Sequence, residues 1–592
     1  MTRENKKQKI FEKKWVAVGL VILLSFIVYS NSFRNNFVFD DIPLVVENKA
    51  IRSLKNIPLL FLTCYWGEGK EYTGLYRPIT ATSFAVDYSL WKLNPVGYHF
   101  TNVFFHALNG LLILNIVLVL LKVGGRPMSV ENEKNKSLNY FIALFVSLIF
   151  ASHPVHTEAV TGIVGRAEVL ATFFFLLSLL LYIKNQFDRK LKYYLTSLIC
   201  FGCALLSKEI AITLPAIVIL YDFYFALNKN KSKLVSKLSH YLGYFVTIGF
   251  YFILKSIAFS SLSSPAILGV FHQETLTTRF YTMSKVFAFY IKLLFYPMNL
   301  CADYYTFSPS YSLFDIQVII SIVVLSAIVI FAFKSYKYSK ITSFAIFWFF
   351  ITLLPVSHII SFGGLMGERF LYLPSVGFCL LLGAIVERAK MLKKTHIIFI
   401  SIILICFSLL TIKRNFVWYD EYNLWLSTVK RVPDNARAHF NLGKACFKKG
   451  LLEEAEEEYK KVINLKPNYI SPYDHLGILY SKRGWFEDAI NIYIQALNIN
   501  SDSAELHNHL GYAYYRTGKY AQAFAEYKRA IDINPNYASA HNNLGAVYAL
   551  KGMNKEAMNE FNKALQINPG NIMAKKNYER ITQNLKRKNI KH

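Results

Sequence analysis

A Leu-Gly pair recurs at a fixed interval in the C-terminal part of the chain. Each pair begins 34 residues after the previous one, and an alanine twelve positions after each glycine keeps the same step. A proline closes three of the four repeats, and Ser501 stands at that position in the other. The repeated positions are Leu442–Gly443, Leu476–Gly477, Leu510–Gly511 and Leu544–Gly545, with Ala455, Ala489, Ala523 and Ala557 and with Pro467, Pro535 and Pro569. Such a period indicates a stack of identical small units rather than a globular core.

A period of 34 residues is typical of tetratricopeptide repeats, each a pair of helices. We assign four repeats, followed by a capping helix and basic tail at 570–592, and the repeats are 434–467, 468–501, 502–535 and 536–569. These repeats stack into a superhelix whose concave face commonly binds an extended peptide.

Asparagines lie on the first helices of the repeats, where side chains tend to line the concave face. An asparagine amide can hold a peptide backbone without reading its sequence. The alternative is a solvated polar surface, and the sequence leaves both open. The candidate peptide-binding residues are Asn441, Asn508, Asn542 and Asn543.

The chain as a whole is more apolar than soluble proteins of its length usually are. Of its 592 residues, 54% are hydrophobic, 16% are aromatic and only 18% are charged, which predicts a core of membrane helices. We therefore expect an all-α protein, a bundle of about 11 membrane helices followed by the repeat superhelix. The expected spans lie near 15–30, 103–121, 138–152, 168–183, 191–206, 210–226, 239–257, 315–333, 341–360, 369–387 and 395–412. Residues 285–298 are apolar but short and carry Lys285 and Lys292, so we expect an interfacial or re-entrant segment.

Lys and Arg orient these helices, because loops rich in them stay in the cytoplasm. Every second loop is basic, including 122–137 and 228–237, and the N-terminus is basic as well. The long first loop, 31–102, is then outside, and an odd number of helices places the repeats outside too. This topology explains the net charge of +28 better than nucleic-acid binding, so we expect no nucleic-acid partner. The seven cysteines form neither a disulfide framework nor a zinc pattern.

Ionisable residues gather in the loops that this topology places outside. Such residues at membrane depth are costly and usually functional. For Arg77, Arg166 and Arg369 the alternative is an interfacial anchor, and for His99, seven residues before His106, it is helix packing. The candidate substrate-binding residues are Arg77, His99, His153, His156, Glu158, Arg166, Lys208, Glu209, Asp303, Glu368 and Arg369.

Six motifs in these loops, read in order, resemble a known family. They are "FVFDD", "YRPIT", "GYHFTNVFFHALN", "HPVHTEAVTGIVGRAE", "SKEIAITLPAIVILYDF" and "GERFLYLPSVGF". Together with the repeats they are similar to the transmembrane and tetratricopeptide-repeat O-mannosyltransferases, within the GT-C class of polyprenyl-phosphate-sugar transferases. The resemblance implies a GT-C-like membrane domain over 1–412, a linker over 413–433, and catalytic acids in the first outer loop, which fall on Asp40 and Asp41. Four repeats are fewer than many animal members have.

The resemblance implies transfer of a sugar, mannose or another hexose, from a polyprenyl-phosphate donor to Ser and Thr hydroxyls of exported proteins. The repeats would bind the acceptor or a partner protein. A carboxylate can act as base, and Arg and Lys can hold the phosphate. We favour Asp41 as base and Asp40 as its orienting partner. A divalent cofactor stays open, although no metal-binding residues stand out.

Two other functions are open: a non-catalytic membrane scaffold, and a polysaccharide ligase or polymerase. The membrane is a bacterial inner membrane with the repeats outside, or the endoplasmic reticulum membrane with the repeats in the lumen.

Overall fold

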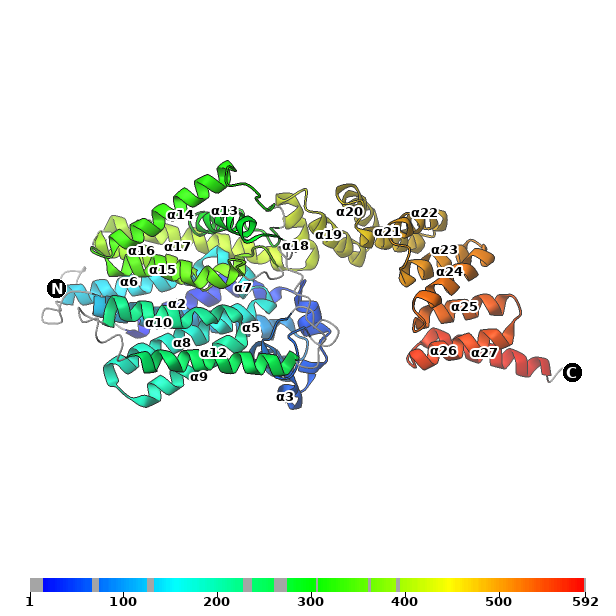
Figure 1. Cartoon of the computed structure of the whole chain (residues 1–592), viewed down its shortest axis with the longest axis horizontal. Helices are drawn as coiled ribbons and strands as arrows, with labels where there is room; N and C mark the ends of the chain where they lie inside the picture. The colour runs from blue at the N-terminus through cyan, green and yellow to red at the C-terminus, as the bar shows by residue number, and fades with distance from the viewer. Residues whose placement is uncertain are drawn as a thin grey trace. The chain divides into compact units, whose positions relative to one another are not determined.

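The protein is described by a computed structural model, and its described residues are 14–66, 74–124, 133–226, 237–259, 274–304, 307–359, 364–389 and 394–589. Over these ranges it contains helices and turns and no strand, which confirms the all-α prediction. The chain divides into two compact units, residues 1–431 and 432–592. Figure 1 shows both units as helical throughout.

The first unit, the membrane unit, is a bundle of long helices, and each span expected from the sequence falls mostly on helical residues. Figure 1 shows these helices side by side, with their connections gathered at the two ends of the bundle. Its helices are α2 (Lys14–Tyr29), α3 (Ile57–Leu60), α4 (Pro78–Trp91), α5 (Pro95–Gly124), α6 (Glu133–Ser152), α7 (Thr157–Val160), α8 (Arg166–Asp188), α9 (Leu191–Ser207), α10 (Leu214–Tyr221), α12 (Leu238–Phe259), α13 (Leu276–Phe295), α14 (Ile316–Ser335), α15 (Lys340–Leu353), α16 (Ser375–Arg388), α17 (Lys394–Asn415) and α18 (Glu421–Arg431).

Length and hydropathy divide these helices into two groups. Within the described residues, seven helical segments are long and apolar enough to cross a membrane. An eighth results if α6 and the short helices after it, bent by 49°, form one broken span. Helices α9, α15 and α16 have 17, 14 and 14 residues, fewer than the roughly 20 that a straight span needs. The sequence prediction of eleven spans therefore exceeds the seven or eight that these criteria support.

Helix α13 covers most of the segment expected to be interfacial, and both its ends contact one end of the bundle. Near its start, Arg279 donates to the carbonyl of Ile359, just after α15, over 3.3 Å. Near its finish, the carbonyl of Leu294 lies 3.0 Å from a ring nitrogen of His153, just after α6. Because α6 and α15 both end on this face, α13 lies along it instead of crossing the bundle.

The second unit, the repeat unit, consists of four helix pairs and a final helix. The glycine that recurs in each Leu-Gly pair is explained by helix packing. A Cβ on Gly443 would lie 2.6 Å from the Tyr459 ring of the paired helix. Gly450, between the two helices, has φ +82°, which a glycine adopts without strain. The helices are α19 (Ala436–Lys449), α20 (Leu452–Leu465), α21 (Ile470–Arg483), α22 (Phe486–Ile499), α23 (Ala504–Arg516), α24 (Tyr520–Ile533), α25 (Ala538–Leu550), α26 (Asn554–Ile567) and α27 (Ile572–Asn589).

The linker expected at 413–433 carries helical structure. It contains the last turn of α17 and all of α18, whose Leu424 and Trp425 are buried. These residues pack within the membrane unit, and the repeat unit begins at Val432.

Candidate functional site

The "FVFDD" segment follows α2 and buries its second aspartate. Asp41 is 2% exposed. One carboxylate oxygen accepts from the backbone N–H of Val38 (3.0 Å) and the other from that of Val164 (2.9 Å) in the second loop. Burial raises the pKa of Asp41 to about 7, against the lowering effect of these two donors, and the charge of Asp40 adds to the rise.

Asp40 is half-buried and lies at the edge of an ionic cluster. Its charge acts on the Arg369 guanidinium and on the Tyr65 hydroxyl as well as on Asp41. The residue before it, Phe39, has φ +50°. Non-glycine residues rarely adopt such a value, so the surrounding structure must hold it.

The centre of the ionic cluster joins the second, third and last of the predicted outer loops. Arg369 binds Glu158 twice, through its guanidinium and its backbone N–H, each over 2.8 Å. Its Nε lies 3.7 Å from a carboxylate oxygen of Glu168, and Lys208 donates to the same oxygen. Burial lowers the pKa of Lys208 to about 8, although Glu168 opposes the shift.

A second pair extends the cluster toward the first loop. Arg77, placed just before α4, contacts Glu209 with Nη2 at 2.9 Å and Nε at 3.2 Å. Its guanidinium also lies over the ring of Tyr65, 5.3 Å from the centroid. The charge of Arg77 reaches Lys208, so the three cations Arg77, Lys208 and Arg369 form one basic group lined by carboxylates.

Glu368, the residue before Arg369, takes part in a separate set of polar contacts. Its Oε1 accepts from the hydroxyl of Tyr304 (2.7 Å) and from the backbone N–H of Cys301, and lies 3.4 Å from Arg414. Burial raises the pKa of Glu368, and Arg414 opposes that shift. Asp303 lies in the same loop, half-buried.

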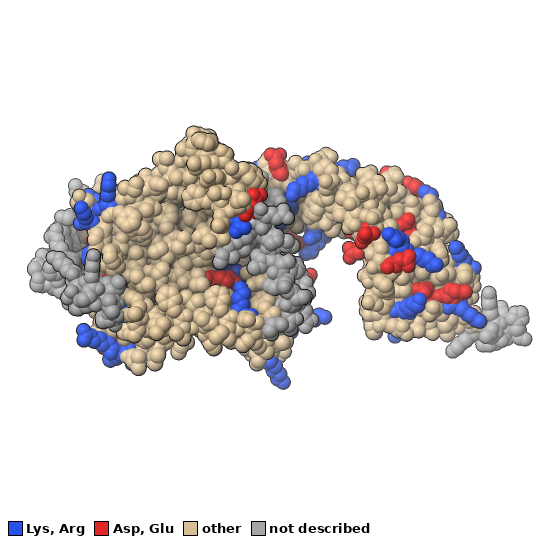
Figure 2. Space-filling model, viewed as in Figure 1, with Lys and Arg blue, Asp and Glu red and all other residues tan. Residues whose placement is uncertain are grey.

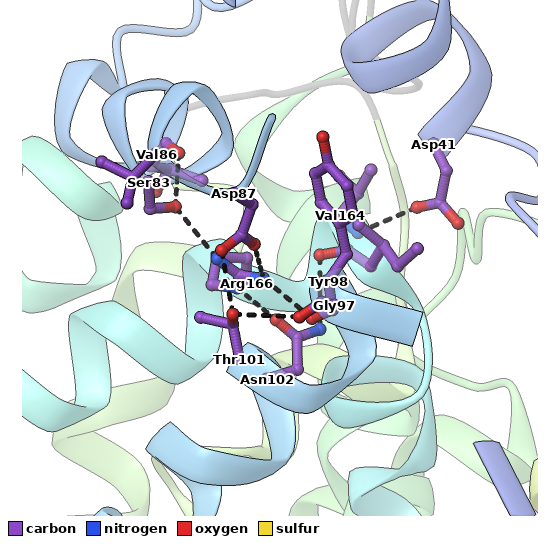
Figure 3. A network of polar contacts seen from close by, with 12 residues as sticks. Asp41, Ser83, Val86, Asp87, Gly97, Tyr98, Thr101, Asn102, Val164 and Arg166 are labelled. Carbon is purple, nitrogen blue, oxygen red and sulfur yellow. Dashed lines mark hydrogen bonds and ion pairs between the residues drawn. The ribbon is translucent and has the colours of Figure 1, made fainter. Parts of the chain in front are cut away.

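Arg166 lies outside the cluster, in a buried network of its own. Figure 3 shows its guanidinium between Asp87 and Asn102, with Asp41 bound to Val164 nearby. The side chain is fully buried, binds Asp87 at 2.7 Å and the carbonyl of Tyr98 at 2.9 Å, and donates to Asn102. Its partner Asn102 donates in turn to the carbonyls of residues 160, 162 and 163, over 3.0 to 3.3 Å. The network thus supports the loop that presents the Val164 N–H to Asp41.

The predicted histidines are buried and bound to neighbouring backbone or hydroxyl groups. His99 contacts the carbonyl of Asn35 at 3.2 Å, and His153 contacts that of Leu294. His156 contacts the hydroxyl of Ser375 at 2.7 Å and the carbonyl of residue 150 at 2.8 Å. These contacts join helices and loops, and none of them reaches the cations of the cluster.

Three residues of this site were not among the sequence candidates: Glu168, Asp87 and Asn102. Glu168 stands inside the motif "HPVHTEAVTGIVGRAE", so motif membership could have flagged it. Asp87 and Asn102 fall in the predicted outer loop 31–102; Asn102 stands inside the motif "GYHFTNVFFHALN", whereas Asp87 belongs to none of the six motifs. Within the described residues, no group of three His, Cys, Asp or Glu is arranged to hold a metal ion.

In the repeat unit, three of the four predicted asparagines, Asn508, Asn542 and Asn543, form a ladder of hydrogen bonds between successive first helices and α27. Asn543 donates to Asn508 over 2.9 Å, and Asn542 accepts from Asn577 of α27 over 3.0 Å. One repeat earlier, His509 contacts Asp474 at 2.8 Å. Each amide has further donors and acceptors beyond these bonds. Asn441, in the first repeat, is half-buried.

This combination defines a class of protein: a multi-pass helical membrane protein with an ion-rich loop face and a C-terminal tetratricopeptide array. The family model described as "TPR repeat" matches residues 443–484, 480–518 and 513–552, and "Tetratricopeptide repeat" matches 538–571. Among solved structures, the crystal structure of MamA protein is 28% identical, with a TM-score of 0.23, over 25% of this chain and 80% of that one.

Relatives with curated names match about three quarters of the chain. Protein O-mannosyl-transferase F38B6.6 of Caenorhabditis elegans is 31% identical over 76% of this chain and 63% of its own length. Human protein O-mannosyl-transferases TMTC3 and TMTC1 are each 28% identical over 78% of this chain, and 52% and 56% of their own lengths. The chain thus spans about half to two thirds of the length of these relatives. It is a homologue of the transmembrane and tetratricopeptide-repeat O-mannosyltransferases, as its motifs predict.

Proposed function

We propose that this protein transfers a sugar, mannose or another hexose, from a polyprenyl-phosphate donor to Ser and Thr hydroxyls of proteins. One observation carries the proposal: the loops at one end of a membrane helix bundle hold the acid pair Asp40–Asp41 and a group of three cations, and the charge of Asp40 acts on one of them, Arg369. A carboxylate next to a phosphate-binding group, at the level of a membrane surface, is what transfer from a lipid phosphate requires.

We assign the general base to Asp40, the reverse of the assignment favoured from sequence. Asp41 is buried, and each of its oxygens already accepts a backbone N–H. Asp40 is more exposed and acts electrostatically on Arg369. In this scheme Asp40 takes the proton of the acceptor hydroxyl, and Asp41 fixes the backbone that presents Asp40.

The donor phosphate would bind Arg369, Lys208 and Arg77. The Arg369 side chain is 38% exposed, against 14% for Arg77 and 6% for Lys208. It is therefore the first cation that a phosphate would meet. Arg166 is excluded from this role, because its guanidinium is fully buried and saturated by Asp87, Asn102 and Tyr98.

The acid pair and its cations would face the outside of the cell or the lumen of the endoplasmic reticulum. Figure 2 shows few charged residues over the middle of the membrane unit, and Lys and Arg gathered at the end where the N-terminus lies. Loops rich in Lys and Arg stay in the cytoplasm. The repeat unit would bind the acceptor or a partner protein through the asparagine ladder, where unused amide groups can hold a peptide backbone.

A non-catalytic scaffold is the second candidate, because the repeat unit alone would serve it. The deciding experiment uses purified full-length protein in lipid, a polyprenyl-phosphate mannose labelled in the sugar, and a Ser/Thr-containing peptide. We expect labelled peptide from the wild type and none from the Asp40→Asn, Asp41→Asn double variant. Equal transfer by both proteins would remove the catalytic role of the acid pair, and no transfer by either would favour the scaffold.

A further inference from the structure

The stretch that joins α17 to α18 contacts both loops that form the Asp40–Asp41 site. We call residues 415–425 the brace segment. Its first residue, Asn415, is fully buried, and its amide nitrogen donates to the carbonyl of Val28 (2.9 Å) and to Asn31 (2.8 Å) at the end of α2. Its amide oxygen accepts from Thr161 of the second loop over 2.7 Å. One side chain thus joins the first helix, the second loop and the last helix of the bundle.

The brace segment also holds the backbone that leads into the acids. The carbonyl of Asn415 accepts from the Asn35 amide over 3.0 Å, and the carbonyl of Tyr419 accepts from the backbone N–H of Asn36 over 2.9 Å. Further on, the ring of Phe39 packs edge-on against Trp425, with centroids 5.1 Å apart and an interplanar angle of 82°. Trp425 is 2% exposed. Phe39 has φ +50°, so Trp425 packs against a residue whose backbone conformation needs support from its surroundings.

On its other side, the brace segment packs against the turn that binds Asp41. The buried Trp418 lies next to Gly162, because a Cβ on Gly162 would be in van der Waals contact with the indole at 3.4 Å. The same Cβ would lie 2.7 Å from the carbonyl of Glu158, so the position requires glycine. Gly162 comes just before the turn Ile163–Gly165, which supplies the Val164 N–H to Asp41. The brace segment therefore contacts both backbone segments that meet at the Asp41 carboxylate.

We propose that the brace segment positions the acid pair, and that Trp425 is its principal positioning residue. This inference rests on the proposed transferase function. The Trp425 ring contacts Phe39, and among the described residues no hydrogen bond or cation–ring contact joins it to Arg77, Lys208 or Arg369. It would therefore act on the orientation of Asp40 and not on donor binding. Misplacing a catalytic group by about 1 Å can cost up to about a hundredfold in rate. Removing the Trp425 ring should therefore lower kcat.

The test compares three variants of the full-length protein in lipid. Trp425→Ala removes the ring, Trp425→Phe keeps an aromatic face for Phe39, and Lys430→Ala changes an exposed residue of the same helix. We expect Trp425→Ala to lower kcat about tenfold to a hundredfold with the KM for the donor within about threefold of wild type. Trp425→Phe and Lys430→Ala should stay within about threefold in both constants. Loss of the Trp425 ring should loosen the loop that carries Asp41 and admit water to its carboxyl group. The pKa of Asp41 should then fall, so the acid limb of the pH profile should move to lower pH in Trp425→Ala only.

Backbone amide hydrogen exchange in the peptide covering residues 36–41 tests the positioning without using activity. We expect faster exchange in Trp425→Ala than in wild type, with unchanged exchange in α8. Unchanged exchange in residues 36–41 would overturn the proposal, and so would faster exchange with unchanged kcat. A rise in the KM for the donor equal to the fall in kcat/KM would assign Trp425 to binding and also overturn it. If wild type transfers no sugar, the transferase function fails, and the exchange result alone decides whether the brace segment holds the loop.

Discussion

Replacing each aspartate of the acid pair by asparagine should give two different losses. In Asp40→Asn the side chain keeps its size and loses its ability to take a proton. General-base catalysis contributes about 10²- to 10⁴-fold, so we expect kcat to fall by that factor at every pH. The protein should fold normally, because Asp40 is only half-buried.

Asp41→Asn acts through the loop. The Asp41 carboxylate accepts the N–H groups of Val38 and Val164, whereas an asparagine offers one oxygen and one NH2. One backbone donor must then face another donor. A hydrogen bond to a charged group is worth about 1.5–3 kcal/mol, which corresponds to a factor of about 10 to 150 if the whole cost falls on the active loop conformation. We expect kcat to fall by that smaller factor.

The pH dependence separates the two roles. Burial raises the pKa of Asp41 from 3.8 to about 7, so one pH unit below this value only about a tenth of the molecules carry the charged side chain. The protonated form is stabilised by folding; this contribution to stability is full below about pH 4 and is lost as the pH rises through about 7. Activity should follow the opposite course and rise through about pH 7, because only the ionised carboxylate accepts from both Val38 and Val164. In Asp41→Asn this rise should vanish.

The assay is the initial rate of sugar transfer from a polyprenyl-phosphate donor to a peptide, measured across about two pH units on each side of neutrality. Thermal unfolding of each variant, measured in parallel, controls for loss of folded protein. A larger loss in Asp41→Asn than in Asp40→Asn would refute the division of roles. An unchanged rise near pH 7 in Asp41→Asn would show that another group titrates there.

Three further predictions concern the cations and the repeat unit. Lys208→Gln and Arg369→Gln should each raise the KM for the donor about tenfold to a hundredfold and leave the KM for the peptide unchanged. Steady-state kinetics with each substrate varied in turn measure both constants. An unchanged donor KM would indicate that these residues have a structural role. A chain ending after Arg431 keeps α18 in place, so it should transfer sugar to a short free peptide within about threefold of wild type and lose its preference for whole proteins; loss of peptide transfer would show that the repeat unit supports the site. The hydrogen bond to Glu526 raises the pKa of His507 while burial opposes it, so its stabilisation is present below the unfolded pKa of about 6.5 and is lost as the pH rises through the folded value. His507→Gln should therefore lower the Tm of the repeat unit more in mild acid than in alkali, and an equal drop at both pH values would contradict that linkage.

Local patterns predict the elements of this fold, because they depend on residues close in sequence. The 34-residue period gives every helix pair of the repeat unit, and the clash between a Cβ at Gly443 and Tyr459 explains why the small residue recurs. The apolar runs give the helices of the membrane unit. They do not give the number of spans, because short buried helices such as α15 and α16 have the composition of a span without its length.

The site itself depends on contacts that local patterns do not encode. Arg369 and Glu158 are 211 residues apart, and Asn415 and Val28 are 387 apart. Motif content predicts that the loops carry ionisable residues, and topology predicts that they meet on one face. Which cation pairs with which acid depends on how α8, α9 and α16 pack. The roles of Asp40 and Asp41 are not readable from sequence either, because the backbone turn at Phe39 decides which carboxylate is buried.

The pairing of the cluster has a consequence for how a donor could bind. Three partly or fully buried cations would be costly without counter-charges, and each has one: Glu158 for Arg369, Glu168 for Lys208, and Glu209 for Arg77. A phosphate that enters must join or replace these carboxylates. At Lys208 the carboxylate is as buried as the cation, so replacement would leave a buried anion unpaired. At Arg369 the guanidinium is 38% exposed and presents five N–H donors, so a phosphate can bind its free edge while Glu158 stays in place. Under the proposed function, donor binding would therefore begin at Arg369, the cation on which the charge of Asp40 acts.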